Sequence, residues 1–175
     1  QQYYVNLVYR DMIRSLLRYA AICPGGHLPR AVRFYFDDFA ATSRIHDFPQ
    51  QLCILRSAGM SAVILLQAES SLEAVYRSEA DVIRANCSCF CYLAGGMDDR
   101  SIEMASKKFN RPYAEILSAP IGKIFVLRSG HKPQELKRFN TLDCKGYHEY
   151  LKVNGLLEHL DDLREQGANY ESFST

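Results

Sequence analysis

The sequence lacks a long hydrophobic run. Its longest uninterrupted apolar stretch, Cys89 to Ala94, spans six residues, whereas a helix that crosses a membrane needs about 20. No initiator methionine or hydrophobic leader is present at Gln1, so we interpret the chain as a piece of a longer protein. These 175 residues are expected to be soluble as given.

The sequence also lacks an excess of charge of one sign. Lysine and arginine number 21 against 20 acidic residues, which leaves a formal net charge of +1. This balance argues against a nucleic-acid or membrane surface that covers the whole domain, although it leaves room for a local basic patch. Apolar residues make up 47% of the chain, enough for a folded core and at most two domains.

Cysteine is scattered and does not form the dense framework of a small disulfide-rich domain. The six cysteines are Cys23, Cys53, Cys87, Cys89, Cys91 and Cys144. We interpret them as reduced thiols of a cytosolic protein. Cys87, Cys89 and Cys91 alternate along one predicted strand, where neighbouring sulfurs would lie about 7 Å apart, too far for one tetrahedral metal site. They are therefore predicted to be buried thiols.

Hydrophobic periodicity predicts alternating strands and helices. The predicted strands are Ala31–Phe36, Ser61–Gln67, Cys87–Leu93 and Ile121–Leu127, and the main predicted helices are Tyr4–Ala20, Asp47–Ala58, Ser71–Arg84 and Asp98–Phe109. This alternation favours an α/β fold with a mostly parallel sheet flanked by helices. Residues 1–145 are assigned to it, and residues 146–175 to an acidic, amphipathic C-terminal helical tail that docks on its own domain or on a partner helix.

Two adjacent carboxylates end the first strand. Asp37 and Asp38 directly follow Val32–Phe36, and the carboxyl ends of parallel strands face the ligand crevice. Asp37 could bind a hard cation such as Mg²⁺, and Asp38 could orient or deprotonate an attacking water. The alternative, of about equal weight, is a solvated turn that caps the next segment.

Two further polar residues could serve the same chemistry. Gln67 ends the second strand, where an amide could lie between a phosphate and a water; the alternative is an ordinary strand-end amide. Arg56 lies near the end of the intervening helix. It could neutralise charge in a neighbouring subunit's site, or it could simply complement the dipole of its own helix.

The order of these segments resembles the C-terminal half of the motor domain in TraG/TraD-type coupling ATPases of conjugative type IV secretion. The residues that carry the resemblance are Phe34–Ala40, Arg44-Ile45, Asp47-Phe48, Arg56–Gly59, Ile64–Gln67, Tyr76, Asn86-Cys87 and Tyr92–Gly96. The resemblance implies a RecA-like domain over about residues 1–145. Asp37 would stand at the end of the Walker B strand and bind Mg²⁺, and Asp38 and Gln67 would act on the attacking water. Arg56 would be an arginine finger.

The resemblance also implies the biology of the whole protein. Such proteins are ATP-driven translocases, anchored in a membrane with a cytoplasmic motor, and they form hexameric rings. They pass a relaxase-bound single DNA strand to the secretion channel. ATP and Mg²⁺ are the expected cofactors of the full-length protein, and single-stranded DNA, the relaxase, channel proteins and other copies of the chain are its expected partners.

Two departures from the family pattern qualify these expectations. The family usually has Asp-Glu where this chain has Asp37-Asp38, which favours slightly the second hypothesis, a docking module for DNA or relaxase without catalysis. A third hypothesis is an unrelated α/β domain. No G-x-x-x-x-G-K-[ST] phosphate loop occurs, because Leu117 and Ile124 break the pattern around Gly122-Lys123. The chain alone is therefore expected to hold no nucleotide tightly and to be inactive.

The missing loop has a structural consequence. In RecA-like sheets the phosphate-loop strand lies beside the sensor strand, which by the resemblance is the strand that ends at Gln67. The absence of the phosphate-loop strand would therefore leave unpaired strand edges and an incomplete sheet. We expect the isolated chain to compensate by repacking or by forming a strand-exchanged dimer.

Positive charge gathers in the second half of the chain, at Lys107-Lys108, Arg111, Lys132, Lys137-Arg138 and Lys145, with Phe109, Tyr113 and Phe139 between them. These groups could follow a DNA backbone and stack on bases, and the alternative is a solvated basic face.

Overall fold

The structure is a computed structural model that describes residues 2–41, 44–139 and 144–153. The helices are α1 (Gln2–Ile22), α2 (Phe48–Leu55), α3 (Glu69–Tyr76), α4 (Ala80–Ala85), α5 (Asp99–Phe109), α6 (Tyr113–Leu117) and α7 (Lys145–Val153), with short 3₁₀ turns η1 (Pro24–Gly26) and η2 (Arg77–Glu79). The strands are β1 (Val32–Phe36), β2 (Met60–Ile64), β3 (Cys89–Leu93), β4 (Lys123–Arg128) and β5 (Gln134–Lys137). None of the helices in these ranges is long and apolar enough to cross a membrane.

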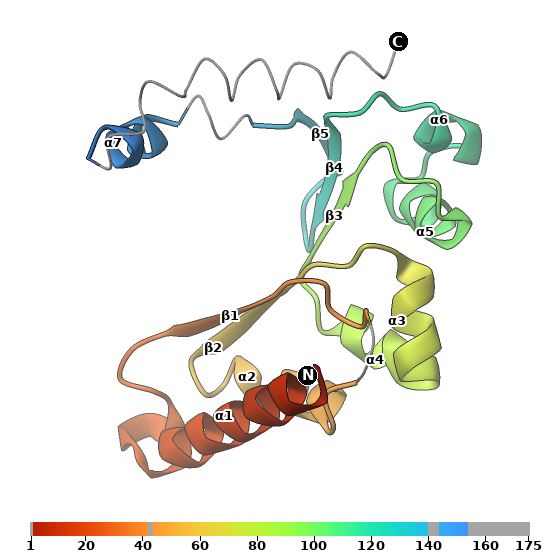
Figure 1. Cartoon of the computed structure of the whole chain (residues 1–175). Coiled ribbons are helices and arrows are strands. Elements are labelled where there is room, and N and C mark those ends of the chain that lie inside the picture. Colours follow the sequence, from red (N-terminus) through yellow and green to blue (C-terminus); the bar gives the residue numbers. More distant parts are fainter. Residues whose placement is uncertain (1, 42–43, 140–143, 154–175) are drawn as a thin grey trace. The chain divides into compact units, whose positions relative to one another are not determined.

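The chain forms two compact units, a first unit of residues 1–88 and 98–104 and a second unit of residues 89–97 and 105–175. Figure 1 shows the elements of each. The predicted α/β composition is found in both, whereas the boundary proposed at residue 145 stays a prediction. Residues 154–166 of the proposed tail helix lie outside the described part of the chain.

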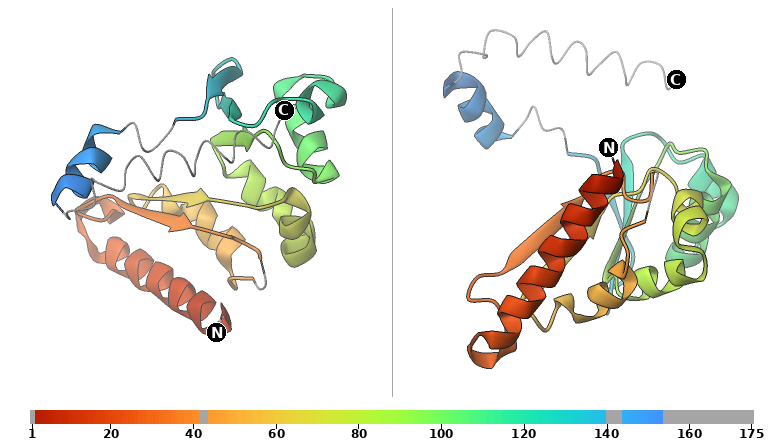
Figure 2. Two further views of the ribbon diagram at one scale, coloured as in Figure 1. Left: turned by 45° about the horizontal axis from the view of Figure 1, so that its top comes forward. Right: turned by 60° about the horizontal axis from the view of Figure 1, so that its bottom comes forward.

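The first unit is built on a parallel pair of strands. β1 and β2 pair in parallel, with Val32 opposite Met60 and Phe36 opposite Ile64. Figure 2 shows α1 running beside this pair, and Tyr9 of α1 meets Phe36 with ring centroids 5.1 Å apart. Among the described residues no third strand joins the pair.

Aromatic side chains make the core of the first unit. Phe36, Phe39, Phe48 and Tyr76 are all buried, and the centroids of the neighbouring rings lie 4.9–5.6 Å apart. Alternation along β1 turns Phe34 and Phe36 into this core and leaves Tyr35 between them exposed. The segment that follows β1 is therefore held in place by packing on both sides of its polar turn.

Two helices differ from the prediction. The predicted helix Ser71–Arg84 is broken into α3 and α4, because Arg77 takes a backbone φ of +52°, which no α-helix tolerates. Asp47 stands before α2 as predicted, but it has a φ of +61° and its side chain makes no cap hydrogen bond.

The second unit contradicts the prediction of a mostly parallel sheet. β3 pairs with β4 antiparallel, β4 pairs with β5 antiparallel, and these three strands form a sheet separate from the β1–β2 pair. Apolar periodicity predicts that a segment is a strand but carries no information on its direction, so the parallel assumption for Cys87–Leu93 and Ile121–Leu127 was wrong. β5 was missed because all four of its side chains are exposed.

The cysteines of β3 are also not buried. Cys87, Cys89 and Cys91 are exposed, whereas Tyr92 is buried. Alternation places Cys89 and Cys91 on the face of β3 opposite to Phe90 and Tyr92. The thiols were predicted to be buried, but the structure covers only the aromatic face of this strand.

Candidate functional site

Asp38 and Gln67 lie side by side at the carboxyl ends of β1 and β2. The Gln67 Nε2 amide donates a hydrogen bond of 2.8 Å to Asp38 Oδ1, and both side chains are exposed. The two strands run in the same direction, so both of their following turns emerge at one edge of the sheet. The sequence placed each residue at the end of a predicted strand, and the family resemblance implied that both act on one water.

Backbone pairing continues past the strands and fixes these turns. The Leu65 N–H donates to the Phe36 carbonyl at 2.9 Å, and the Phe39 N–H donates to the Leu65 carbonyl at 2.9 Å. Between these bonds Asp38 takes a φ of +49°, in the left-handed region, and its N–H donates to Asp37 Oδ1 at 3.1 Å. The chain thus turns sharply while both carboxylates stay at the strand end.

A small cavity adjoins the two carboxylates. It has a volume of about 110 Å³ and is lined by Val5, Asn6 and Tyr9 of α1, by residues 36–40 and by Ile45. Sites for drug-sized ligands usually have 300–1,000 Å³, so this space suits a few water molecules rather than a nucleotide. The described part of the chain thus forms a polar corner without a complete nucleotide pocket.

The carboxylates fit the chemistry of Mg²⁺ only in part. Within the described residues no group of three or more histidine, cysteine, aspartate or glutamate side chains could hold a metal ion. Mg²⁺ is commonly bound by one or two carboxylates together with waters and the phosphates of a substrate. Asp37, with Asp38 beside it, could supply the protein's share of such a site.

Arg56 lies apart from this corner. It is exposed and caps the C-terminal end of α2, four residues before β2 begins. The carbonyls of the neighbouring Ala58 and Gly59 accept hydrogen bonds from Leu28 and Val32, at the start of β1. Arg56 therefore belongs to the amino-terminal edge of the parallel pair, and the structure does not bring it to Asp38 and Gln67 of the same chain.

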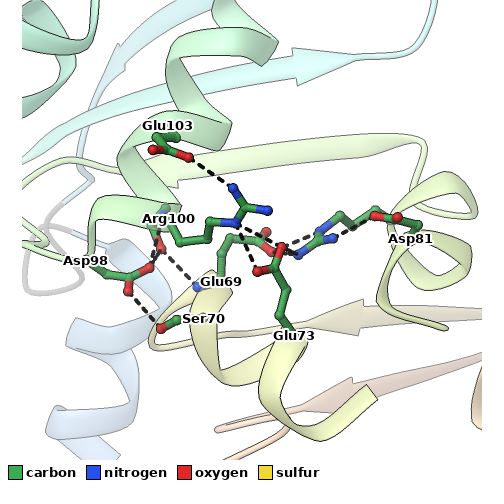
Figure 3. A network of polar contacts seen from close by, with 9 residues as sticks. Glu69, Ser70, Glu73, Asp81, Asp98, Arg100 and Glu103 are labelled. Atoms are coloured by element: carbon green, nitrogen blue, oxygen red, sulfur yellow. Dashed lines mark hydrogen bonds and ion pairs between the residues drawn. The ribbon is translucent and has the colours of Figure 1, made fainter. Parts of the chain in front are cut away.

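A network of charged side chains anchors the segment that follows Gln67 (Figure 3). Glu69 is buried, and its carboxylate accepts two hydrogen bonds from Arg84, at 3.0 and 2.8 Å. Arg84 also bonds Glu73 at 3.0 Å and Asp81 at 2.8 Å. One arginine of α4 therefore ties together three carboxylates on α3 and α4.

The same segment is tied to the start of α5. The Glu69 N–H donates to Ser101 Oγ at 2.9 Å, and Ser101 in turn donates both its hydroxyl and its N–H to Asp98, at 2.6 and 2.8 Å. Ser70 also donates to Asp98, at 2.7 Å. Asp98 thus has the position and bonds of a helix N-cap, and the Gln67 turn is held two residues before this junction.

The network shifts the pKa values of its members. Burial tends to lower the pKa of Arg84, but hydrogen bonds and charges of Glu69, Asp81 and Glu73 raise it above its usual value. The hydrogen bond from Arg100 lowers the pKa of Glu73. Burial opposes the change at Asp98, yet hydrogen bonds from Ser101 and Ser70 lower its pKa. These groups are therefore charged at neutral pH, and the network is fully formed.

Sequence reasoning missed this network. Arg84, Glu69 and Asp98 lie on three segments, and no spacing rule relates them. The one signal present was an aspartate, Asp98, at the start of the predicted helical segment, a residue type that is favoured at helix N-caps.

In the second unit, some members of the predicted basic and aromatic patch are used in contacts within the protein. Phe109 is buried, with its ring centroid 5.8 Å from that of Phe90 and 5.4 Å from that of Phe125, so it cannot stack on a base. Arg111 forms ion pairs with Glu115 at 3.0 Å and with Glu135 at 2.8 Å. Part of the positive charge that was expected to contact DNA is thereby neutralised within the protein. Phe139 remains exposed.

Comparison with known proteins finds a family model that covers the candidate site. A family model described as the TraM recognition site of TraD and TraG matches residues 31–112, the range that holds all four predicted site residues. The resemblance to TraG/TraD-type coupling proteins is confirmed. None of the curated proteins compared with the chain matches it significantly.

Solved structures of a coupling protein share the fold. The bacterial conjugative coupling protein TrwB, in its unbound monoclinic form, aligns with a TM-score of 0.61 at 20% identity over 74% of this chain and 35% of that one. Its trigonal form with sulphate aligns with a TM-score of 0.64 at 20% identity over 75% and 35%. TrwB in complex with ADP and Mg²⁺ aligns with a TM-score of 0.60 at 19% identity over 73% and 35%.

These matches support the RecA-like fold, with helices and a parallel strand pair. The chain spans about a third of the length of the coupling-protein structures it matches.

Proposed function

We propose that this chain is part of an ATP-driven DNA translocase that couples a relaxase–DNA complex to a type IV secretion channel during conjugation. The observation that carries the proposal is the 2.8 Å hydrogen bond between Gln67 and Asp38 at the ends of two parallel strands. A carboxylate and an amide at adjoining strand ends suit phosphoryl transfer to water, because one can accept a proton and the other can orient the water.

Each site residue has a proposed role. Asp37 binds Mg²⁺, which neutralises phosphate charge when it is bound with ATP. Asp38 accepts the proton of the attacking water, and the Gln67 amide orients that water. Solved structures of TrwB include complexes with ADP and Mg²⁺ and with non-hydrolysable analogues of GTP and ATP, which supports the use of these cofactors by the full-length protein.

Arg56 acts across a subunit interface in this proposal. Its place at the amino-terminal edge of the strands keeps it from the Asp38–Gln67 pair of its own chain. An exposed arginine in that position can instead reach the site of a neighbouring copy in a ring, where its charge stabilises the transition state. The proposed assembly is a hexamer, on the cytoplasmic side of a membrane to which the complete protein is anchored.

The chain by itself is proposed to be inactive. Nothing in its sequence supplies the backbone amides and lysine of a phosphate loop, and the cavity at the carboxylates is too small for a nucleotide. A titration of the 175-residue chain with Mg·ATP, followed by calorimetry, is expected to show no tight binding. Tight binding would contradict this reading of the missing loop.

The decisive experiment measures DNA-stimulated ATPase activity in the complete protein. Asp38→Asn is expected to lower kcat by about 100-fold or more, the usual contribution of a general base. Gln67→Ala is expected to lower kcat by about the same factor, because the attacking water loses its orientation. Gln50→Ala is the matched control, because Gln50 is also an exposed glutamine but bonds Glu79 instead. Unchanged turnover in both site variants would remove the motor assignment.

The role of Arg56 has a separate test in mixed rings. Arg56→Ala and Asp38→Asn proteins are each expected to be nearly inactive alone. When they are mixed, an Asp38→Asn subunit still offers its Arg56 to the intact Asp38 of its neighbour, so part of the activity returns. If activity does not recover in rings that are shown to be mixed, Arg56 does not act across the interface and only complements the dipole of its own helix.

A docking module without catalysis is the second candidate function. The family model that matches residues 31–112 is named for a TraM recognition site, which favours a surface for a relaxosome protein. In this case Asp38→Asn and Gln67→Ala leave ATP turnover intact, and surface variants in residues 31–112 abolish binding of a TraM-type protein in a pull-down experiment.

A further inference from the structure

Two thiols lie next to each other on the exposed face of β3. Cys89 Sγ and Cys91 Sγ are 3.8 Å apart, and both residues are exposed. They are closer than the roughly 7 Å spacing of alternate residues on an extended strand, because the two side chains lean toward one another.

The packing of the sheet fixes the face that these thiols occupy. Phe90 contacts Phe109, and Tyr92 contacts Phe125, with centroids 5.8 and 6.3 Å apart. Because successive side chains of a strand point to opposite faces, the packing of these aromatic rings places Cys89 and Cys91 on the other face. The pair is thus set by the core of the second unit and not by a loop.

The sulfur separation matches the bite of a tetrahedral thiolate site. With Zn–S bonds of about 2.3 Å and tetrahedral angles, two sulfurs on one ion lie about 3.8 Å apart. The two thiols therefore need little movement to bind one ion together. Thiolates favour thiophilic cations such as Zn²⁺ over hard cations such as Mg²⁺.

Metal binding at this pair is coupled to proton release. A cation that binds both sulfurs must displace their protons, so its affinity falls as the pH falls. Arg128 lies opposite Cys89 in the β3–β4 register and places a positive charge near the thiolates that form.

We propose that Cys89 and Cys91 form a two-thiolate chelate for a thiophilic divalent cation, with Zn²⁺ as the natural class of ligand. Each chain that binds releases two thiol protons to solvent and forms two metal–sulfur bonds, which replace water ligands of the hydrated cation, with no change in oxidation state. The two remaining positions of the ion are filled by water or by the same pair of a second copy of the chain.

Titration of the 175-residue chain with Cd²⁺, a spectroscopic substitute for Zn²⁺, tests the proposal. The expected result is a sulfur-to-cadmium charge-transfer band that saturates at one ion per chain if water completes the site, or at one ion per two chains if a second copy does. The Cys89→Ser/Cys91→Ser variant should lose more than about 100-fold in affinity. Cys53→Ser, which removes another exposed thiol, should bind as the parent does.

A protection experiment on the parent chain gives a second measurement, which does not depend on whether a variant folds. Cd²⁺ added to the parent chain should slow the alkylation of Cys89 and Cys91 by iodoacetamide, read by peptide mass spectrometry, and leave Cys53 unprotected. A band undiminished in the double variant, or equal alkylation of Cys89 and Cys91 with and without Cd²⁺, would overturn the proposal.

Discussion

The two sheets of this molecule place their reactive groups in different ways. In the parallel β1–β2 pair, the polar side chains of Asp38 and Gln67 meet at the strand ends. In the antiparallel β3–β4–β5 sheet, the two thiols meet on a strand face. Parallel strands deliver all their following turns to one edge, whereas antiparallel strands send them to opposite edges. The direction of pairing thus decides where chemistry can gather.

The two units also differ in how arginine is used. Arg84 of the first unit bridges three carboxylates with a side chain that is 14% exposed, and Arg111 of the second bridges two carboxylates with a side chain that is 47% exposed. Buried ion pairs are costly to break, and exposed ones contribute little. The predictions that follow test this contrast.

Phe48→Ala should have the largest effect on stability. Phe48 is fully buried against Phe36 and Phe39, and removal of a buried aromatic ring costs about 3–5 kcal/mol. Urea unfolding of the chain measures it. Phe139→Ala, at a residue that is 65% exposed, should change the free energy of unfolding by less than about 0.5 kcal/mol. Equal effects of the two variants would contradict the aromatic core assigned to the first unit.

Arg84→Met should rank second. It leaves the buried carboxylate of Glu69 without its partner, which costs about 3 kcal/mol. Arg111→Met is the matched variant in the second unit and should cost less than about 1 kcal/mol, because its pairs are exposed. Urea unfolding of both variants measures the difference, and similar losses would remove the contrast between the two units.

Tyr76→Phe should have an intermediate effect. It removes the hydrogen bond of 2.9 Å that the Ile45 N–H donates to the Tyr76 hydroxyl, at a cost of about 1–2 kcal/mol. Burial raises the pKa of Tyr76 from 10.0 to about 12, so the folded protein keeps a proton that the unfolded chain loses. The parent should therefore lose stability between pH 10 and 12. Chemical unfolding across this range should show a smaller loss in Tyr76→Phe, and equal slopes would refute the assignment.

Asp98→Asn should give the smallest effect, a modest loss of stability at neutral pH that shrinks in acid. Hydrogen bonds from Ser101 and Ser70, acting against burial, lower the pKa of Asp98 below 3.8. Its contribution is therefore present above pH 3.8 and is lost as the pH falls through the lower, folded pKa. The variant should lose less stability than the parent on acidification. An acid profile of Asp98→Asn that matches that of the parent would argue against the cap.

Much of the first unit could be predicted from the sequence. The run Val32–Phe36 followed by two acids indicated a buried strand with a polar end, and the same logic for Gln67 brought the two ends together. The prediction worked because each strand is short, strongly apolar and followed by a turn. The roles of Asp37, Asp38, Gln67 and Arg56 remain predictions.

The rest depended on contacts between distant segments. The antiparallel direction of β4 is set by pairing with β3 and β5, which no local pattern reveals. Cys89 and Cys91 looked buried because their run is apolar, although only one face of that strand is covered. The Arg84 network joins three helices, and only their packing brings Glu69, Glu73 and Arg84 within bonding distance.

The left-handed backbone of Asp38 decides which substitution there can be interpreted. Aspartate and asparagine enter this conformation more readily than residues with longer side chains, so a change to glutamate would alter reach and backbone strain together. Asparagine keeps the size and the tolerated conformation, and it replaces a basic, charged oxygen by a neutral amide. Lost turnover in that variant would then measure the loss of this proton-accepting oxygen without a large distortion of the turn that presents it.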